Sequence, residues 1–174
     1  MEAGQLSYSE YERLRKAFAP EQTGDATTML RAVRSVKSRW EIDRIRESAR
    51  IHDEVYARIP SLYEPGMSDL DLQKSIEALM RRKGSIGLFR SFGPKMDCFM
   101  GTVLAGDNAA EPSPFDYALG GRGVDSAPVG ACGMPITEGT TVAVDMAGNF
   151  TEYVTDMTRV FSLGNLPAEA YRAH

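Results

Sequence analysis

Two aspartates near the end of the chain are the residues whose type and spacing could carry out chemistry. Asp145 lies in the run Thr141–Met146, and Asp156 lies in the run Tyr153–Phe161. Both runs are rich in β-branched and aromatic residues, and Gly148-Asn149 lies between them. This pattern predicts an antiparallel hairpin with one carboxylate on each strand.

The position of the hairpin loop decides how far apart the two carboxylates lie. The aspartates are eleven positions apart, and an odd separation lets them lie directly opposite each other if the loop is centred near Phe150-Thr151. We expect this register, with the two Cβ atoms roughly 4.5–5.5 Å apart on one face of the sheet. A tight turn at Gly148-Asn149 would instead displace them by about four residues, or ~13 Å.

Carboxylates at the shorter spacing repel each other, and this repulsion raises the pKa of one of them unless a cation lies between them. A divalent metal ion removes that penalty. The alternative is a solvated hairpin with two ordinary surface aspartates, and the spacing alone favours this simpler interpretation. A metal site is therefore a hypothesis that needs support from the rest of the chain.

Composition limits the class of protein. The chain has 174 residues, of which 43% are hydrophobic and 25% charged, as in one ordinary globular domain. The formal net charge is −4, and Lys and Arg are interspersed with acidic residues, so we expect no nucleic-acid partner. There is no run of about 18 apolar residues, and residues 1–20 are polar, so we expect no membrane association and a cytoplasmic location. We interpret Cys98 and Cys132 as reduced thiols.

Two amphipathic helices are expected to support the hairpin. The capping box Ser38-Arg39-Trp40-Glu41 predicts a helix that ends at Pro60. Its apolar or aromatic positions recur in steps of three and four: Ile42, Ile45, Ala49, His52, Tyr56 and Ile59. We expect His52 to be a packed histidine bonded to a neighbour rather than a ligand. The second helix begins at Ser68 and ends before Gly84.

The remaining segments complete the predicted fold. Residues 7–18 predict a short helix stopped by Pro20, and Cys98–Ala105 predicts a strand. Residues 109–139 contain four prolines and six glycines, and an unstructured connection of this length is usually functional or flexible. These elements predict an α+β fold in which amphipathic helices pack on one face of an antiparallel sheet.

Four segments together resemble the pita-bread metallopeptidase family, which includes aminopeptidase P, prolidase, creatinase and methionine aminopeptidase. The segments are VKS with EIDRIRESARIHD, EPGMSDLDL, VLAGDNAAEPS, and ITEGTTVAVDMAGNFTEYVTDMTRVFSLG, which lie within 36–53, 64–72, 103–113 and 136–164. The similarity is closest to the Xaa-Pro aminopeptidase and dipeptidase branch. It implies that residues 31–174 form the N-terminal half of a pita-bread catalytic domain, and that residues 1–30 are the remnant of a preceding domain and its linker.

The resemblance also implies a chemistry. Asp145 and Asp156 match the pair that bridges two divalent metal ions in the family, which hydrolyses peptides with proline at the second position. Manganese is the ion we expect first, with cobalt, iron or zinc as alternatives. Metals in such a site activate a water and polarise the peptide carbonyl.

Two departures from the family pattern affect this expectation. The family completes its site with a histidine and two glutamates from a second half that would follow His174, so we expect the chain alone to bind metal weakly and to be inactive. Ser113 stands where peptidase members usually have a catalytic histidine, so the catalytic residue is unknown. Glu152 also replaces the glycine that commonly precedes the matching tyrosine.

Other interpretations remain open. The chain could be a non-catalytic pita-bread module that binds peptides or proteins, which the serine at position 113 favours and the intact aspartate pair disfavours. Creatinase-like chemistry, which needs no metal, would require a histidine in the segment that contains Ser113. Half of a two-lobed fold exposes apolar surface and open strand edges, so we expect the chain to form a homodimer or to aggregate.

Overall fold

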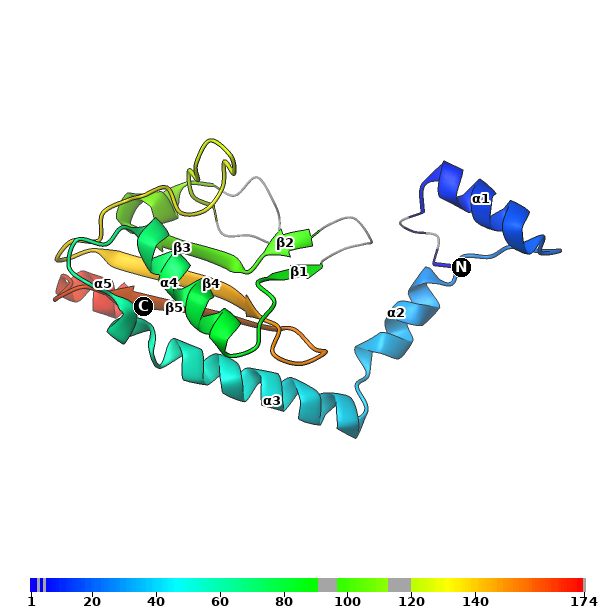
Figure 1. Cartoon of the computed structure of the whole chain (residues 1–174), viewed down its shortest axis with the longest axis horizontal. Coiled ribbons are helices and arrows are strands. Elements are labelled where there is room, and N and C mark those ends of the chain that lie inside the picture. Colours follow the sequence, from blue (N-terminus) through cyan, green and yellow to red (C-terminus); the bar gives the residue numbers. More distant parts are fainter. Residues whose placement is uncertain (3, 5, 91–96, 113–119, 174) are drawn as a thin grey trace. The chain divides into compact units, whose positions relative to one another are not determined.

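The chain divides into two compact units, Met1–Ile42 and Asp43–His174. The computed structural model describes all residues except 3, 5, 91–96, 113–119 and 174, and Figure 1 shows its helices and strands. In the first unit, α1 (Tyr8–Phe18) begins at a capping box formed by Ser7 and Glu10, and α2 (Thr27–Ser35) follows. The helix predicted over residues 7–18 is confirmed. The assignment of residues 1–30 to a preceding domain stays a prediction.

The two predicted amphipathic helices are α3 (Arg39–Tyr56) and α4 (Asp69–Arg82). At the start of α3, the Ser38 N–H donates to the Glu41 carboxylate at 2.7 Å, and the Glu41 N–H donates to the Ser38 hydroxyl at 3.4 Å. Ser68 and Asp71 exchange the same pair of bonds at the start of α4. A 3-10 helix, η2 (Ile59–Leu62), follows α3, and a short helix, α5 (Ala168–Ala173), follows the last strand.

The main sheet contains β3 (Gly101–Ala105), β4 (Thr141–Gly148) and β5 (Thr155–Ser162), all antiparallel and in that order. A separate antiparallel pair is formed by β1 (Leu88–Arg90) and β2 (Asp97–Phe99). Among the helices that the structure describes, none is long and apolar enough to cross a membrane.

The core lies on one face of the main sheet. Side chains alternate between the faces along a strand, and Val142, Val144 and Met146 of β4 all point to the same, buried face. They pack against α3 and α4, whose contributions to the core are Val55, Tyr56, Leu72, Ile76, Leu79 and Met80. The α+β fold with helices on one face of the sheet is confirmed (Figure 1). Asp145 points to the opposite face.

The strand predicted over Cys98–Ala105 is wrong in one respect, because the chain breaks it into β2 and β3 at Met100. Gly101 has a φ of +149°, a conformation that residues with a side chain rarely adopt. A Cβ atom at this position would lie 1.9 Å from the Asp145 carbonyl oxygen. Only glycine therefore allows β3 to approach β4 this closely, and the chain passes from one sheet to the other at this point.

A buried carboxylate anchors the long connection between η3 (Gly106–Ala110) and β4. Asp69, at the start of α4, is fully buried and accepts hydrogen bonds from the backbone N–H groups of Gly133 and Met134 at 2.8 and 2.9 Å. The fully buried Asn108 donates to the Asp69 carboxylate at 3.0 Å. Asn108 also donates to the Gly130 carbonyl at 3.1 Å and accepts from the Arg122 N–H at 2.8 Å. The described part of the connection is thus tied to the helix layer.

We expect Asp69→Asn to lower the free energy of unfolding by roughly 2–4 kcal/mol, because an amide NH₂ cannot accept bonds from the buried N–H groups that now meet the carboxylate. Asp53→Asn, at an exposed position of α3, is the matched control and should cost much less. Urea denaturation of both variants measures the difference. Equal losses would contradict the anchoring role of Asp69.

Candidate metal centre

Asp145 and Asp156 lie on neighbouring strands and on the same face of the sheet. Asp145 of β4 is paired with Thr158 of β5, and Asp156 of β5 is paired with Ala147 of β4. The two aspartates are therefore diagonal neighbours, two positions away from direct opposition. Diagonal neighbours have Cα atoms about 7–8 Å apart, with the Cβ atoms somewhat closer.

The predicted direct pairing of the two aspartates is wrong, because the hairpin loop is centred one residue later than expected. The strands β4 and β5 end their pairing at Gly148 and Thr155, which places the loop centre between Thr151 and Glu152. A shift of the loop centre by one residue displaces the opposing residues by two, so both side chains stay on one face. The prediction of a shared face is confirmed, and the alternative of a tight turn at Gly148-Asn149 is excluded.

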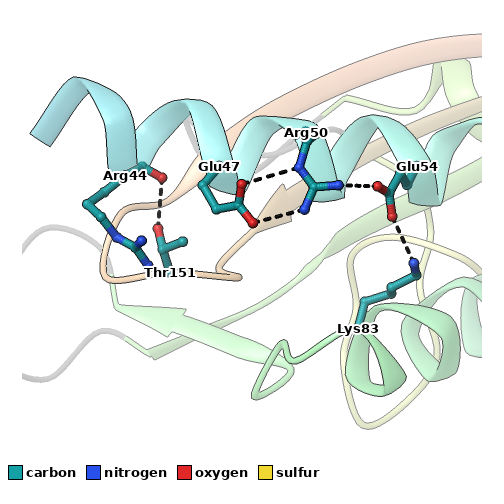
Figure 2. A network of polar contacts seen from close by, with 6 residues as sticks. All are labelled: Arg44, Glu47, Arg50, Glu54, Lys83 and Thr151. Carbon is teal, nitrogen blue, oxygen red and sulfur yellow. Dashed lines mark hydrogen bonds and ion pairs between the residues drawn. The ribbon is translucent and has the colours of Figure 1, made fainter. Parts of the chain in front are cut away.

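Contacts to α3 hold the loop in this position. The Thr151 hydroxyl donates to the Arg44 carbonyl at 3.2 Å, and the Arg44 guanidinium donates to Glu152 at 3.1 Å. Figure 2 shows Arg44 and Thr151 at this contact, beside a row of charges on α3 that continues to Lys83, directly after α4. The Asn149 amide donates to the Leu88 carbonyl at 2.6 Å. The departure at position 152, Glu in place of the usual glycine, thus supplies one of the contacts that fix the loop.

Asp145 is half-buried and hydrogen-bonded. The Thr158 hydroxyl donates to its carboxylate from the paired position on β5. Burial raises the pKa of Asp145 above its usual value; the Thr158 hydrogen bond lowers that pKa and the Asp156 carboxylate raises it. The carboxylates are therefore close enough to influence each other, and a cation between them would relieve the repulsion.

Thr102 of β3 lies next to Asp145 on the side of β4 opposite to β5. It is the residue of β3 paired with Asp145, it is 2% exposed, and its hydroxyl has no hydrogen-bond partner among the described residues. Gly130 covers it, since a Cβ atom at Gly130 would lie 3.2 Å from the Thr102 methyl group. Sequence reasoning missed both threonines. Only Thr158 had a signal, its spacing of two from Asp156, which places both on one face of a strand.

The donor set fits part of a metal site. Oxygen ligands on one open sheet face suit a hard divalent ion, and carboxylates bind such ions at about 2.0–2.6 Å. Within the described residues, no group of three or more His, Cys, Asp and Glu side chains could hold a metal ion. Two carboxylates fall short of the four or more ligands that a closed site uses. Ser113, at the position of the family's usual histidine, lies outside the described residues.

His52 supports the hairpin from the helix side, as the sequence predicted. It is fully buried, and its Nδ1 is 3.1 Å from the Thr155 hydroxyl, directly before Asp156. Its ring and the Tyr56 ring form a T-shaped pair with their centroids 5.0 Å apart. Cys132 is a free thiol, as expected, whereas the side chain of Cys98 lies outside the described part of the chain.

Comparison with known proteins identifies the family. The model of metallopeptidase family M24 matches residues 43–174. The chain belongs to this metallopeptidase family. The resemblance inferred from the four sequence segments is thereby confirmed.

Two curated relatives that carry the name of a peptidase are similar to the chain. The chain is 27% identical over 151 residues to the probable dipeptidase PepE of Mycobacterium tuberculosis, covering 86% of this chain and 33% of that protein. It is 22% identical over 164 residues to the uncharacterized peptidase YqhT of Bacillus subtilis, covering 94% of this chain and 39% of that protein. The chain thus spans between a third and two fifths of these relatives.

Solved structures show the same fold. The X-Pro aminopeptidase of Thermotoga maritima matches with a TM-score of 0.74 at 20% identity, covering 98% of this chain and 42% of that one. The Xaa-Pro dipeptidase of Bacillus anthracis matches with a TM-score of 0.72 at 22% identity, covering 98% of this chain and 41% of that one. The predicted fold, half of a pita-bread fold, is confirmed.

The buried histidine predicts a pH dependence of stability. Burial lowers the pKa of His52 below its ordinary value of 6.5; Asp156 and Asp53 oppose this shift, and Arg159 adds to it. The unfolded chain therefore takes up a proton near that ordinary value, while the folded chain keeps His52 neutral. The contribution to stability is fully present above pH 6.5 and is lost as the pH falls toward the folded-state pKa.

Urea denaturation at several values between about pH 8 and pH 5 measures this dependence. His52→Gln, which cannot titrate in this range, is the comparison, and its unfolding free energy should fall less steeply as the solution is acidified. Parallel pH profiles for the two proteins would contradict the role of His52.

Proposed function

We propose that the chain forms part of a dinuclear metal-dependent exopeptidase of the Xaa-Pro type, in which Asp145 and Asp156 bind the divalent ions. The observation that carries the proposal is the placement of both carboxylates on the sheet face that the helices leave open. Membership in family M24 supports metal-dependent peptide hydrolysis. The names of the similar solved structures, X-Pro aminopeptidase and Xaa-Pro dipeptidase, support peptides with proline at the second position as substrates.

The chain's own residues have separate tasks in this proposal. Asp145 and Asp156 hold the ions, and the Thr158 hydroxyl fixes the orientation of the Asp145 carboxylate. Thr102 offers a second hydroxyl beside Asp145, from β3. Bound divalent ions supply Lewis-acid polarisation of a peptide carbonyl and a water of lowered pKa. Manganese is the proposed ion, because all the donors are hard oxygen atoms. The cytoplasmic location and the homodimer stay predictions.

A non-catalytic binding module is the second candidate, and the serine at position 113 is the feature that favours it. A serine cannot supply the cationic donor that a histidine offers. The two candidates differ in their need for metal, because a binding module gains nothing from a pair of neighbouring carboxylates. Turnover of Xaa-Pro dipeptides with manganese by a full-length relative that carries this serine would favour the enzyme. Absence of both turnover and bound metal would favour the module.

Isothermal titration of the 174-residue chain with Mn²⁺ at neutral pH tests the metal site. We expect a dissociation constant weaker than about 1 μM, because two carboxylates supply too few ligands for a closed site. Asp145→Asn and Asp156→Asn should each weaken binding by about tenfold or more. Asp43→Asn, an exposed aspartate on α3, is the control and should bind as the unaltered chain does. Submicromolar affinity would contradict the expectation of an incomplete site, and equal binding by all variants would contradict the assignment of Asp145 and Asp156 as ligands.

A further inference from the structure

Tyr56 places a hydroxyl group within the β4–β5 ladder. Its side chain reaches from α3 to the sheet and is 6% exposed. The hydroxyl donates to the Met157 carbonyl of β5 and accepts from the Met146 N–H of β4 at 3.1 Å. The Val144 carbonyl lies 3.3 Å away. One hydroxyl therefore contacts the backbones of both strands.

The register shows where in the ladder this hydroxyl lies. The Ala147 N–H donates to the Met100 carbonyl on the β3 side, so odd-numbered residues of β4 bond toward β3 and even-numbered residues bond toward β5. Val144 and Met146 are even-numbered, and they are the residues directly before and after Asp145. The pair Asp145 and Thr158 is therefore a non-hydrogen-bonded pair of the β4–β5 ladder, surrounded by a wide backbone ring. The Tyr56 hydroxyl contacts this ring from the helix side.

The proposed metal site lies on the other face of the same ring. The Asp145 side chain projects from the ring away from the helices, and Asp156 is next to Met157, whose carbonyl accepts the tyrosine bond. We propose that Tyr56 is a positioning residue whose hydroxyl sets the local spacing of β4 and β5, and with it the separation of the Asp145 and Asp156 carboxylates. This inference rests on the proposed function, because the spacing matters only if the two carboxylates share a site.

The diagonal register makes this spacing important. The carboxylates of directly opposed aspartates would lie side by side. Diagonal neighbours have Cα atoms about 7–8 Å apart, so their side chains must extend toward each other to contact a common ion. Metal–ligand distances lie within about 0.2 Å of their preferred values. A change in the gap between the strands therefore changes how far both side chains must reach toward a common ion. Residues that orient metal ligands from behind typically change affinity by about 10–100-fold when they are altered.

The surroundings keep the tyrosine in place and protonated. His52, one turn earlier on α3, packs against its ring in a T-shaped arrangement and contacts Thr155, the neighbour of Asp156. Burial raises the pKa of the Tyr56 hydroxyl above its usual value, so the group keeps its proton for the bond to Met157. Two consecutive turns of one helix thus contact the strand segments on which both aspartates lie.

Tyr56→Phe removes the hydroxyl and leaves the ring, and it should alter the ladder even without metal. The Met146 N–H then has the Met157 carbonyl as its remaining partner. The NMR scalar coupling across the Met146 N–H to Met157 C=O hydrogen bond should therefore increase in the variant. Tyr63→Phe is the matched control, because the Tyr63 hydroxyl donates at 3.2 Å to the Ile136 carbonyl, outside both strands. It should leave that coupling unchanged.

Titration with Mn²⁺ then measures whether the change in the β4–β5 ladder alters the affinity of the proposed metal site. Tyr56→Phe should weaken binding by about tenfold, and Tyr63→Phe should bind as the unaltered chain does even if it lowers the unfolding temperature by a similar amount. An unchanged coupling in Tyr56→Phe, or a changed coupling with unchanged affinity, would overturn the positioning role. If the aspartate variants bind as the unaltered chain does, the proposed metal site itself fails, whatever Tyr56 does to the ladder.

Discussion

The register of the β4–β5 hairpin is the constraint on which the candidate site depends. Side chains alternate between the two faces of a strand, so a slip of one residue in the pairing would move Asp156 to the helix side while Asp145 stayed on the open face. The observed register keeps both carboxylates on the open face as diagonal neighbours. Gly148 helps to hold it, because a Cβ atom there would lie 2.7 Å from the Thr155 hydroxyl oxygen and 2.8 Å from His52 Nδ1.

The helix face and the open face of the sheet have different tasks. On the helix face, Tyr56 and His52 of α3 contact the strand segments that carry the aspartates. Arg44 of the same helix contacts the hairpin loop (Figure 2). On the open face, the connection that includes Gly130 covers Thr102. That connection is tied to α4 through the buried Asp69 and Asn108. The site is therefore held by the helix layer on one side and bordered by an anchored segment on the other.

Membership in family M24 gives this arrangement its chemical context. The chain spans about two fifths of the solved relatives, with helices and sheet arranged as in their fold. Its two carboxylates and their threonine neighbours lie on one face of the sheet, where we propose that they form a partial donor set for divalent ions. The electrostatic energy of the pair depends on its surroundings. Without a cation the two carboxylates repel each other, whereas a cation between them attracts both.

Local patterns in the sequence determined much of this protein. Capping boxes at Ser38 and Ser68 marked the starts of both main helices, the β-branched runs marked the hairpin, and the parity of the aspartate spacing placed both carboxylates on one face. These features depend on residues a few positions apart, so they can be read from the chain. The family resemblance was equally accessible, because its segments occur in order along the sequence.

Only the tertiary structure decided the rest. The loop centre is set by contacts such as that between Thr151 and Arg44, which lie 107 residues apart, and the position of Tyr56 in the ladder depends on how α3 packs on the sheet. The same holds for Asp69, whose backbone partners Gly133 and Met134 lie more than 60 residues away in the sequence. A sequence pattern reports which face a side chain takes, because that follows from local backbone geometry. The distance between two strands, and what lies behind them, follows from packing between remote segments, which no local pattern contains.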